Sequence, residues 1–341
     1  MIRGIWGIYF QILELVVVTM CGRFKMTNIP ENLLISIIVP VYREESNINQ
    51  FLQRMEAVLT KLNLPYEILF CLDPSPDKTE LVIMEEIKRN ENIRLIKFSR
   101  RFGQPAATMA GIHLCKGDVC VVIDVDLQDP PELIEEMLDR WRDGYKVVYA
   151  KRRSRKGETF LKTWISHFGY RVINNISDVS IPSDTGDFRL MDRRVIDELK
   201  RLNESHGFLR GMVAFIGFRQ TYVEYDRDER VSGISSYNRY LGSLRIAING
   251  IVGFSIRPLQ IVSLIGGFIA VGAFLLGLWI LIEKLVLRVE ITPGLTWTIV
   301  LITFLSGVQL LSLGVMGEYV GRIYEEVKRR PQYIVEKTEN F

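Results

Sequence analysis

The sequence predicts an α/β domain built on a mostly parallel sheet, followed by a transmembrane helical hairpin. Apolar strand-like and helix-like segments alternate from residue 33 to residue 150, which is the pattern of a parallel sheet with helices on both faces. A short β-branched strand, residues 119–125, ends in two aspartates. Near the C-terminus, residues 259–282 and 295–317 contain no charged side chain. These features divide the chain into a sheet domain and a membrane anchor.

The first 32 residues precede the sheet domain as an extension. Residues 5–20 are apolar apart from Gln11, Glu14 and Thr19, which is too short and too interrupted for a membrane span. No small-residue cleavage site is evident, so a signal peptide is not indicated. We expect this extension to lie at a membrane interface or outside the fold, without a catalytic role.

The elements of the sheet domain, residues 33–232, follow from the spacing of apolar side chains. Runs of β-branched residues predict strands, and apolar residues three and four apart predict helices. The predicted strands are residues 34–41, 66–72, 93–98, 119–125 and 145–150, and the predicted helices are residues 47–63, 79–89, 105–115 and 131–142.

The loops at the carboxyl ends of these strands are expected to carry the site. They are residues 40–46, 73–78, 99–104 and 124–129. The sequence contains no Gly-x-Gly-x-x-Gly motif and no Walker loop. The sequence therefore indicates neither a dinucleotide-binding enzyme nor a P-loop enzyme.

Asp124 and Asp126 form the main candidate metal site. Side chains at i and i+2 of an extended chain point the same way, so the two carboxylates repel each other unless a cation lies between them. Two or three oxygen ligands completed by substrate phosphates are the usual environment of Mg²⁺ or Mn²⁺. A purely structural role for the pair is the weaker alternative.

Asp129 has a different expected role. The Asp-Pro-Pro-Glu sequence ahead of helix 131–142 predicts that Asp129 caps this helix, with Glu132 completing a capping box and Pro130 and Pro131 in the first turn.

A dense basic cluster follows strand 145–150. It is either a solvated loop or an electrostatic clamp for phosphates at a membrane surface. Its members are Lys151, Arg152, Arg153, Arg155, Lys156 and, nearby, Lys162.

The remainder of the sheet domain provides one more candidate. Asp187, ahead of the strand-like residues 188–190, is a candidate general base or acceptor-site anion, and a turn-capping role is the alternative. Residues 207–218 predict an interfacial helix and residues 222–226 a strand. Residues 235–254 form an amphipathic, aromatic-bearing helix within a juxtamembrane segment, 233–257, which lies in the headgroup plane or packs on the sheet domain.

Each uncharged C-terminal segment is long enough to cross the roughly 30 Å hydrocarbon core. The connection between them, residues 283–294, has few cations. The positive-inside rule therefore predicts a multi-pass protein of the bacterial inner (plasma) membrane, with its sheet domain and C-terminal tail, residues 319–341, in the cytoplasm. The cations that set this orientation are Arg245, Arg257, Arg322, Lys328, Arg329 and Arg330.

Composition excludes several classes of function. A net charge of +3 gives no sign of a nucleic-acid partner, and three histidines argue against a histidine-based metal or acid–base site. The cysteines have no paired spacing, so buried thiols are expected rather than zinc ligands or disulfides. They are Cys21, Cys71, Cys115 and Cys120.

Several motifs together resemble the polyprenyl-phosphate glycosyltransferases of inverting glycosyltransferase family 2. The resemblance covers about residues 33–335 and is strongest to the bactoprenol glucosyltransferase type, which is related to dolichol-phosphate mannose synthase. It is carried by the paired apolar segments and by the stretches Ser-Ile-Ile-Val-Pro-Val-Tyr-Arg-Glu-Glu from Ser36, Phe102-Gly-Gln, Asp124-Val-Asp-Leu-Gln-Asp-Pro-Pro-Glu and Asp187-Phe-Arg-Leu-Met-Asp-Arg.

The resemblance implies a GT-A, Rossmann-like fold and a set of site residues. It implies nucleotide-sugar contacts by Pro40, Tyr42, Glu44, Asp73, Gln104 and Asp124. It implies that Mg²⁺ or Mn²⁺ is held by Asp126, Gln128 and Asp124, and that Asp126 and Asp187 are catalytic. It adds Arg210, Arg227 and Arg230 to the basic cluster as residues that bind the acceptor phosphate. The chain departs from the family pattern at Leu72, Pro74, Arg101 and Ser236.

The resemblance also implies an activity. The expected enzyme is a metal-dependent hexosyltransferase that moves glucose from UDP-glucose to undecaprenyl or another polyisoprenyl phosphate at the cytoplasmic membrane face, with inversion. Homo-oligomerisation is implied by the resemblance alone. Three alternatives remain. The same reaction could use GDP-mannose or a UDP-aminosugar, and the chain could be a non-catalytic membrane partner that binds nucleotide sugar or lipid phosphate. A processive polysaccharide synthase is disfavoured, because there are only two strong spans and no Gln-x-x-Arg-Trp motif.

Overall fold

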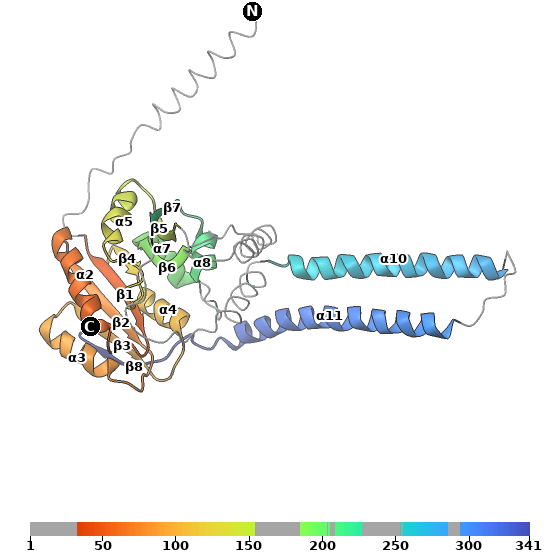
Figure 1. The fold of residues 1–341 in the computed structure, drawn as a ribbon, viewed down its shortest axis with the longest axis horizontal. Coiled ribbons are helices and arrows are strands. Elements are labelled where there is room, and N and C mark those ends of the chain that lie inside the picture. Colours follow the sequence, from red (N-terminus) through yellow and green to blue (C-terminus); the bar gives the residue numbers. More distant parts are fainter. Residues whose placement is uncertain are drawn as a thin grey trace, which may run out of the picture.

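The computed structural model describes residues 33–153, 185–202, 204, 209–226, 253, 255–285 and 294–341. A sheet domain lies at one end of the molecule, and two long helices project from it side by side (Figure 1). The predicted N-terminal extension, the segment after the basic cluster and most of the juxtamembrane helix fall outside the described residues.

The described part of the sheet domain is organised on eight strands in the order β7-β5-β6-β4-β1-β2-β3-β8. Strands β4, β1, β2 and β3 are parallel neighbours, and β5 is parallel to β7. Strand β6 runs antiparallel between β4 and β5, and β8 is antiparallel to β3. The bounds are β1 (Ile35–Val41), β2 (Tyr66–Leu72), β3 (Ile93–Phe98), β4 (Val119–Val122), β5 (Val147–Arg152), β6 (Thr185–Asp192), β7 (Gln220–Tyr225) and β8 (Val335–Glu339).

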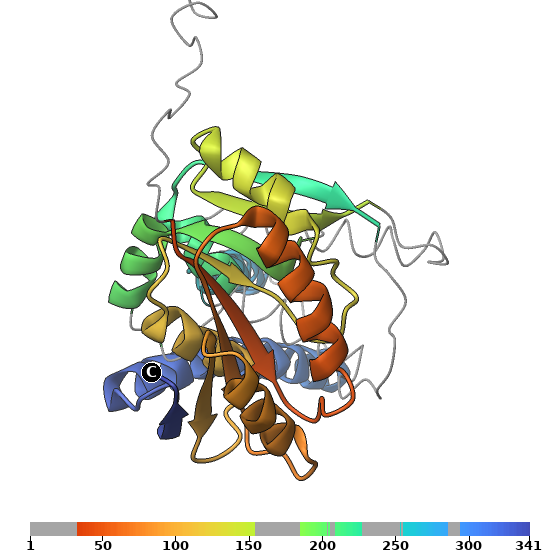
Figure 2. The same ribbon diagram turned by 90° about the vertical axis from the view of Figure 1, so that its left-hand side faces the viewer.

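Helices cover both faces of this sheet (Figure 2). One apolar core joins the sheet to α2 and α5 through residues such as Phe51 and Met137, and the other joins it to α4, α7 and α8 through residues such as Met109 and Ile196. Every residue of β1 is buried because this strand lies between the two cores. The helices are α2 (Ile48–Leu62), α3 (Thr79–Arg89), α4 (Gln104–Leu114), α5 (Leu133–Arg142), α7 (Arg193–Arg201) and α8 (Leu209–Ile216).

The predicted mostly parallel α/β sheet is confirmed, and the element boundaries differ by only a few residues. Strand β4 ends at Val122 rather than Val125, and the chain then turns through Leu127, whose φ is 57°. Helix α4 begins at Gln104 after Gly103, whose φ of 90° suits glycine.

The predicted capping box at Asp129 is wrong. Helix α5 begins at Leu133, its N-cap residue is Glu132, and the Glu132 side chain makes no capping hydrogen bond. Glu132 instead forms a two-pronged ion pair with Arg54, at 2.6 and 2.9 Å. Asp129 is buried and accepts a hydrogen bond from the Tyr225 hydroxyl. Contacts with residues distant in the sequence thus replace the predicted cap of helix α5.

The two long helices are α10 (Arg257–Leu285) and α11 (Leu295–Lys328), with 29 and 34 residues. At ~1.5 Å per residue both exceed the roughly 30 Å hydrocarbon core. Within the described residues one helix is apolar enough throughout to cross a membrane: Arg257–Leu276 has a mean hydropathy of 2.3, and none of it is buried inside the protein. Helix α11 also exposes large apolar side chains, including Phe304 and Leu310. Exposed apolar surface of this extent indicates contact with lipid.

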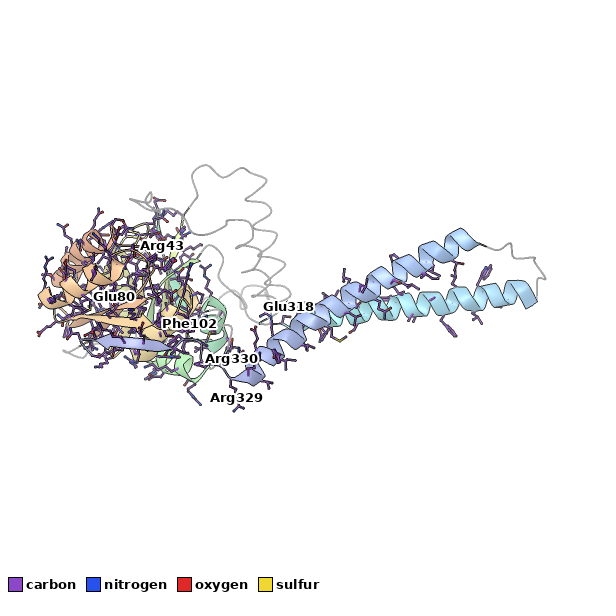
Figure 3. The ribbon with its side chains drawn as sticks, turned by 90° about the horizontal axis from the view of Figure 1, so that it is seen from below. Arg43, Glu80, Phe102, Glu318, Arg329 and Arg330 are labelled. Atoms are coloured by element: carbon purple, nitrogen blue, oxygen red, sulfur yellow. The ribbon has the colours of Figure 1, made fainter. Side chains whose placement is uncertain are left out.

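The C-terminal tail is part of the sheet, which the sequence did not predict. Helix α11 continues eleven residues beyond the predicted span, and Glu318, Arg329 and Arg330 lie at its sheet-domain end (Figure 3). Strand β8 then pairs antiparallel with β3. At the end of β8, the Asn340 side-chain amide donates to the carbonyls of Glu91 and Ile93 at 2.6 and 2.9 Å.

Tyr333 attaches the link between α11 and β8 to the domain. Its ring lies 5.8 Å from the rings of both Phe98 and His113, and a 2.9 Å hydrogen bond joins its hydroxyl to His113 Nδ1. The Ser99 backbone N–H donates to the Ile334 carbonyl at 3.0 Å. The second long helix is thereby anchored to β3 and α4.

Replacing Tyr333 should measure this anchor. We expect Tyr333→Ala to destabilise the domain by about 2 kcal/mol, less than the cost of a fully buried ring, and to lower Tm by about 4–8 °C. Tyr333→Phe is the matched control, because it keeps the ring and loses one hydrogen bond worth about 1 kcal/mol. Thermal unfolding in detergent measures both; an unchanged Tm in Tyr333→Ala would show that the link is not anchored here.

Candidate active site

The predicted site loops lie together at one edge of the sheet. Strands β4, β1, β2 and β3 are parallel neighbours, so the loops after them meet at the carboxyl edge, where ligands bind in such sheets. Strand β6 is antiparallel to β4, with Arg189 opposite Val122. Asp187, two residues earlier on β6, therefore lies beside the end of β4 at this same edge. Arg152 ends β5, which is antiparallel to β6.

Asp73 holds the loop between β3 and α4. Its carboxylate is 3% exposed and accepts hydrogen bonds from the backbone N–H groups of Phe102 and Gly103, each at 2.9 Å. Both carboxylate oxygens thus fix the backbone just before Gln104. The structure gives Asp73 a role in shaping the loop, in addition to the nucleotide contact expected from the resemblance.

Gln104 connects this loop to the aspartate pair. Its side-chain amide donates to Asp124 Oδ1 at 2.8 Å. Asp126 is 7% exposed and its Oδ1 accepts the Gln128 backbone N–H at 3.2 Å. The positive φ of Leu127 brings this N–H back toward Asp126. Gln104 is therefore bonded to Asp124, and Asp126 is separately bonded to Gln128 within the turn after β4.

The aspartate pair fits a substrate-completed cation site. The described residues contain no group of three or more His, Cys, Asp or Glu side chains that could enclose a metal ion, so a closed zinc site with four protein ligands does not fit them. Mg²⁺ and Mn²⁺ are commonly held by one or two carboxylates together with substrate phosphates. Asp124 and Asp126 provide that donor set.

Tyr42, just after β1, has two arginine side chains beside its ring. The sequence analysis named Tyr42 but did not predict these arginine contacts. The Arg101 guanidinium carbon lies 4.0 Å from the centre of the Tyr42 ring, and that of Arg43 lies 5.3 Å from it. Arg43 has a φ of 60°, and its N–H donates to Ser75 Oγ at 2.9 Å. The only sequence signal was Arg101, which departs from the family pattern.

The other donor-side residues are held by secondary structure. Pro40 lies within β1, opposite Cys71 of β2. The Glu44 carboxylate accepts from the Asn47 side-chain amide at 2.6 Å. The Glu44 N–H donates to Thr79 Oγ1 at 3.0 Å. Glu44 thereby joins the starts of α2 and α3.

A second cluster surrounds Asp187. Arg210 Nε donates to Asp187 Oδ1 at 3.0 Å, and Arg189 Nη2 lies 3.6 Å from the same oxygen. Burial alone would raise the pKa of Asp187, but the Arg210, Arg189 and Arg152 guanidinium groups outweigh it and hold the pKa below its usual value. Asp187 is therefore a carboxylate at neutral pH.

Arg152 extends this cluster. Its Nε donates to the Tyr225 hydroxyl at 3.2 Å, and its Nη2 lies 3.8 Å from Asp129 Oδ1. Burial alone would lower the pKa of Arg152, but Asp129 and the Tyr225 hydroxyl outweigh it and raise the pKa above its usual value. The structure thus brings Arg152, Asp187 and Arg210 together.

The rest of the predicted basic set is not gathered here. The Arg153 side chain is 60% exposed and lies 3.7 Å from Glu224 and 4.0 Å from Asp226, on the outer edge formed by β7. Lys151 Nζ also lies 3.6 Å from Glu224. The other members, Arg155, Lys156, Lys162, Arg227 and Arg230, lie outside the described residues. Arg189 lies in the Asp187-Phe-Arg-Leu-Met-Asp-Arg stretch but was given no role, because the sequence of a strand does not show that an arginine in it is buried.

Comparisons with known proteins find relatives along most of the chain. The sequence model of the family described as glycosyl transferase family 2 matches residues 36–200. An uncharacterized glycosyltransferase of Bacillus subtilis (strain 168) is 46% identical, over 89% of this chain and 93% of the relative. The bactoprenol glucosyl transferase of Shigella phage SfII is 40% identical, over 89% of this chain and 98% of the relative.

Solved structures give more distant matches. Glucosyl-3-phosphoglycerate synthase from Mycobacterium tuberculosis, crystallised with Mn²⁺, UDP and glucosyl-3-phosphoglycerate, is 16% identical with a TM-score of 0.44, and the match covers 64% of this chain and 78% of that one. Mannosyl-3-phosphoglycerate synthase from Rubrobacter xylanophilus is 16% identical with a TM-score of 0.45, and the match covers 67% and 74%.

Substitution of Asp73 should separate loop shaping from direct nucleotide contact. Asp73→Ala leaves two backbone N–H groups without their carboxylate, so we expect a loss of about 2–3 kcal/mol in unfolding free energy together with weaker UDP binding. Unfolding and calorimetric titration with UDP measure the two effects, with the exposed Glu85→Ala as control. Weaker UDP binding with unchanged stability would indicate a direct contact alone.

Proposed function

Because this chain belongs to glycosyltransferase family 2, we propose that it transfers glucose from UDP-glucose to the phosphate of undecaprenyl or another polyisoprenyl phosphate. Relatives called bactoprenol glucosyl transferases are 38–40% identical over nearly their whole length. The observation that carries the proposal is that one sheet edge holds two separate clusters. One is the Asp124 and Asp126 pair, and the other is the arginine cluster around Asp187.

The donor half of the site comprises the loops after β1 to β4. Asp124, Asp126 and Gln128 would hold the divalent cation, Mg²⁺ or Mn²⁺, which when bound stabilises negative charge on the leaving nucleoside diphosphate. Gln104 and Asp73 fix the loop that faces this pair. Pro40, Tyr42 and Glu44 bind the nucleoside, and the flanking arginines supply positive charge beside the diphosphate.

The acceptor half of the site comprises Asp187, Arg152 and Arg210, together with the basic residues 155, 156, 162, 227 and 230. Guanidinium groups bind phosphate oxygens in pairs and orient the phosphate for attack on the anomeric carbon. A single in-line displacement inverts that carbon. Holding both reactants in line supplies much of the rate.

The reaction needs no strong base. A phosphomonoester has a second pKa near ~6, so the acceptor is largely ionised at neutral pH. Asp187 is held as a carboxylate among arginines. It orients the acceptor or takes a residual proton.

The long helices keep this chemistry beside a lipid that stays in the bilayer. We infer that α10 and α11 cross the plasma membrane of a bacterium as a hairpin, with the sheet domain in the cytoplasm. The cations Arg257, Lys328, Arg329 and Arg330 at the domain ends of the helices support this orientation. Phe102 lies on the side of the domain from which the helices project (Figure 3).

Transfer of radiolabelled sugar into organic-extractable lipid tests the proposed reaction. The assay contains purified protein, undecaprenyl phosphate and Mn²⁺, with UDP-glucose, UDP-galactose, UDP-N-acetylglucosamine or GDP-mannose supplied separately. We expect label from UDP-glucose. Asp126→Asn should reduce it by about 10²–10³-fold, the loss typical when stabilisation of developing charge is removed, whereas Asp139→Asn on the surface of α5 should not.

The other outcomes of this assay discriminate the alternatives. Label from a different donor would support the same mechanism with a different sugar as the substrate. An absence of label from every donor, with nucleotide still bound, would favour a non-catalytic membrane partner. Full activity of Asp126→Asn with saturating metal would contradict the assignment of Asp126.

The pH dependence of turnover should report the acceptor rather than Asp187. The pKa of Asp187 lies below its usual value, so Asp187 stays ionised throughout the range in which the acceptor phosphate loses its second proton near ~6. The rate should fall as pH drops through that value. A phosphonate acceptor, with a higher second pKa, should move the acidic limb to higher pH; a limb that stays in place would point to an enzyme group as the base.

A further inference from the structure

Arg189 is the largest fully buried side chain in the described part of the protein, with 0% exposure. Arginine is rarely buried completely, and removal of its charge from water is costly unless partners replace the water. Arg189 lies in the middle of β6, two residues after Asp187. Its burial there must be explained by its contacts.

Those contacts are with the strand that carries it. Arg189 Nη2 donates to the Gly186 carbonyl at 2.9 Å, and its Nε donates to the Asp187 carbonyl at 3.2 Å. Its Nη2 also lies 3.6 Å from the Asp187 carboxylate. Residues 187 and 189 share one face of the strand because side chains alternate. The guanidinium group thus reaches back along β6 and fixes the Gly186–Asp187 segment.

Packing alone explains the position of Arg189 poorly. Its guanidinium carbon lies 5.2 Å from the centre of the Tyr149 ring, a cation–π contact of modest energy. Its buried Nη1 has no hydrogen-bond partner among the described residues. A buried donor without a partner costs stability, so its retention requires an explanation. Nη1 is also too buried to touch a ligand, so any function must be indirect.

The segment that Arg189 fixes is the one on which the other two arginines converge. Arg210 Nε donates to Asp187 Oδ1 at 3.0 Å. Gly186 allows the Arg152 guanidinium to approach, because a Cβ at position 186 would lie 3.3 Å from Arg152 Nη2. Arg210 repels both Arg152 and Arg189. Asp187 and Asp129 balance two of the three guanidinium charges. The one positive charge left over favours a bound anion.

We propose that Arg189 is a positioning residue for the acceptor phosphate: it holds the Gly186–Asp187 segment so that Arg210 and Arg152 present their guanidinium groups to that anion. This inference rests on the proposed function. Arg189 does not touch either substrate. Its removal should therefore alter the use of the lipid acceptor and leave the donor half of the site intact.

Two variants test this role independently. Arg189→Lys keeps the charge but cannot reproduce two directed contacts from one planar group. Gly186→Ala leaves Arg189 in place and displaces only the end of the flexible Arg152 side chain. The exposed Arg140→Lys on α5 is the matched control. For each protein we would measure Tm, UDP binding by calorimetry, and kcat and KM for undecaprenyl phosphate with saturating UDP-glucose.

We expect Arg189→Lys and Gly186→Ala to reduce kcat/KM for the acceptor by roughly 10- to 100-fold, the loss that follows a misplacement of about 1 Å, with UDP binding unchanged. A folded Arg189→Lys with the same acceptor kinetics as the parent protein would overturn the proposal. Equal losses of Tm, UDP binding and turnover would also overturn it in favour of a structural role. If Arg189→Lys fails to fold, unchanged acceptor kinetics in Gly186→Ala would overturn the placement of Arg152 against the Gly186–Asp187 segment, on which the proposal depends. Absence of any lipid product from the parent protein would instead contradict the proposed function.

Discussion

The pairing of β8 with β3 connects the membrane hairpin to the chemistry of the sheet. After α11 ends at Lys328, only six residues precede β8, and Tyr333 packs among Phe98 and His113 within that link. A lipid phosphate is confined near the membrane surface, whereas a nucleotide sugar arrives from water. A short and anchored connection limits where the carboxyl edge of the sheet can lie, which a long flexible tether would not do.

Strand direction then determines how the proposed sites for the donor diphosphate and the acceptor phosphate are separated. The parallel strands β1 to β4 place their loops at one edge, and this edge carries the aspartate pair. The antiparallel insertion of β6 between β4 and β5 brings Asp187 to the same edge with its arginines. An anionic turn that suits a cation thus adjoins a cationic cluster that suits an anion. Under the proposed function, this separation of charge lets donor and acceptor bind without competing for the same side chains.

Much of the fold could be predicted from sequence because its central strands are local apolar runs. Strand β1, Ile-Ser-Ile-Ile-Val-Pro-Val, is buried along its whole length. Strand β8 was missed because its sequence, Val-Glu-Lys-Thr-Glu, is that of a polar tail and its partner β3 is more than 230 residues away. The predicted capping box was wrong for a similar reason, because Asp129 contacts Tyr225 and Arg152, which are distant in the sequence.

In the candidate site, too, some residues could be predicted from the sequence and others depend on contacts made in the fold. Asp124 and Asp187 were named from the sequence pattern and the family resemblance. Gln104 and Arg210 were named from the resemblance alone, and Arg152 from the density of the basic cluster. The sheet brings Asp124 and Gln104 together, and separately Asp187, Arg210 and Arg152. Arg189 could not be recognised, because its burial depends on the sheet and on Tyr149 rather than on local sequence. The second role of Asp73 depends likewise on a loop about thirty residues further along the chain.

The configuration of the sugar in the lipid product tests the central claim most directly. Enzymatic product formed from UDP-glucose and a polyisoprenyl phosphate can be purified and its anomeric proton coupling measured by NMR. A single displacement between the two clusters predicts a β-linked glucosyl phosphate, inverted relative to the α-linked donor. An α-linked product, or free glucose without lipid-linked sugar, would contradict the account.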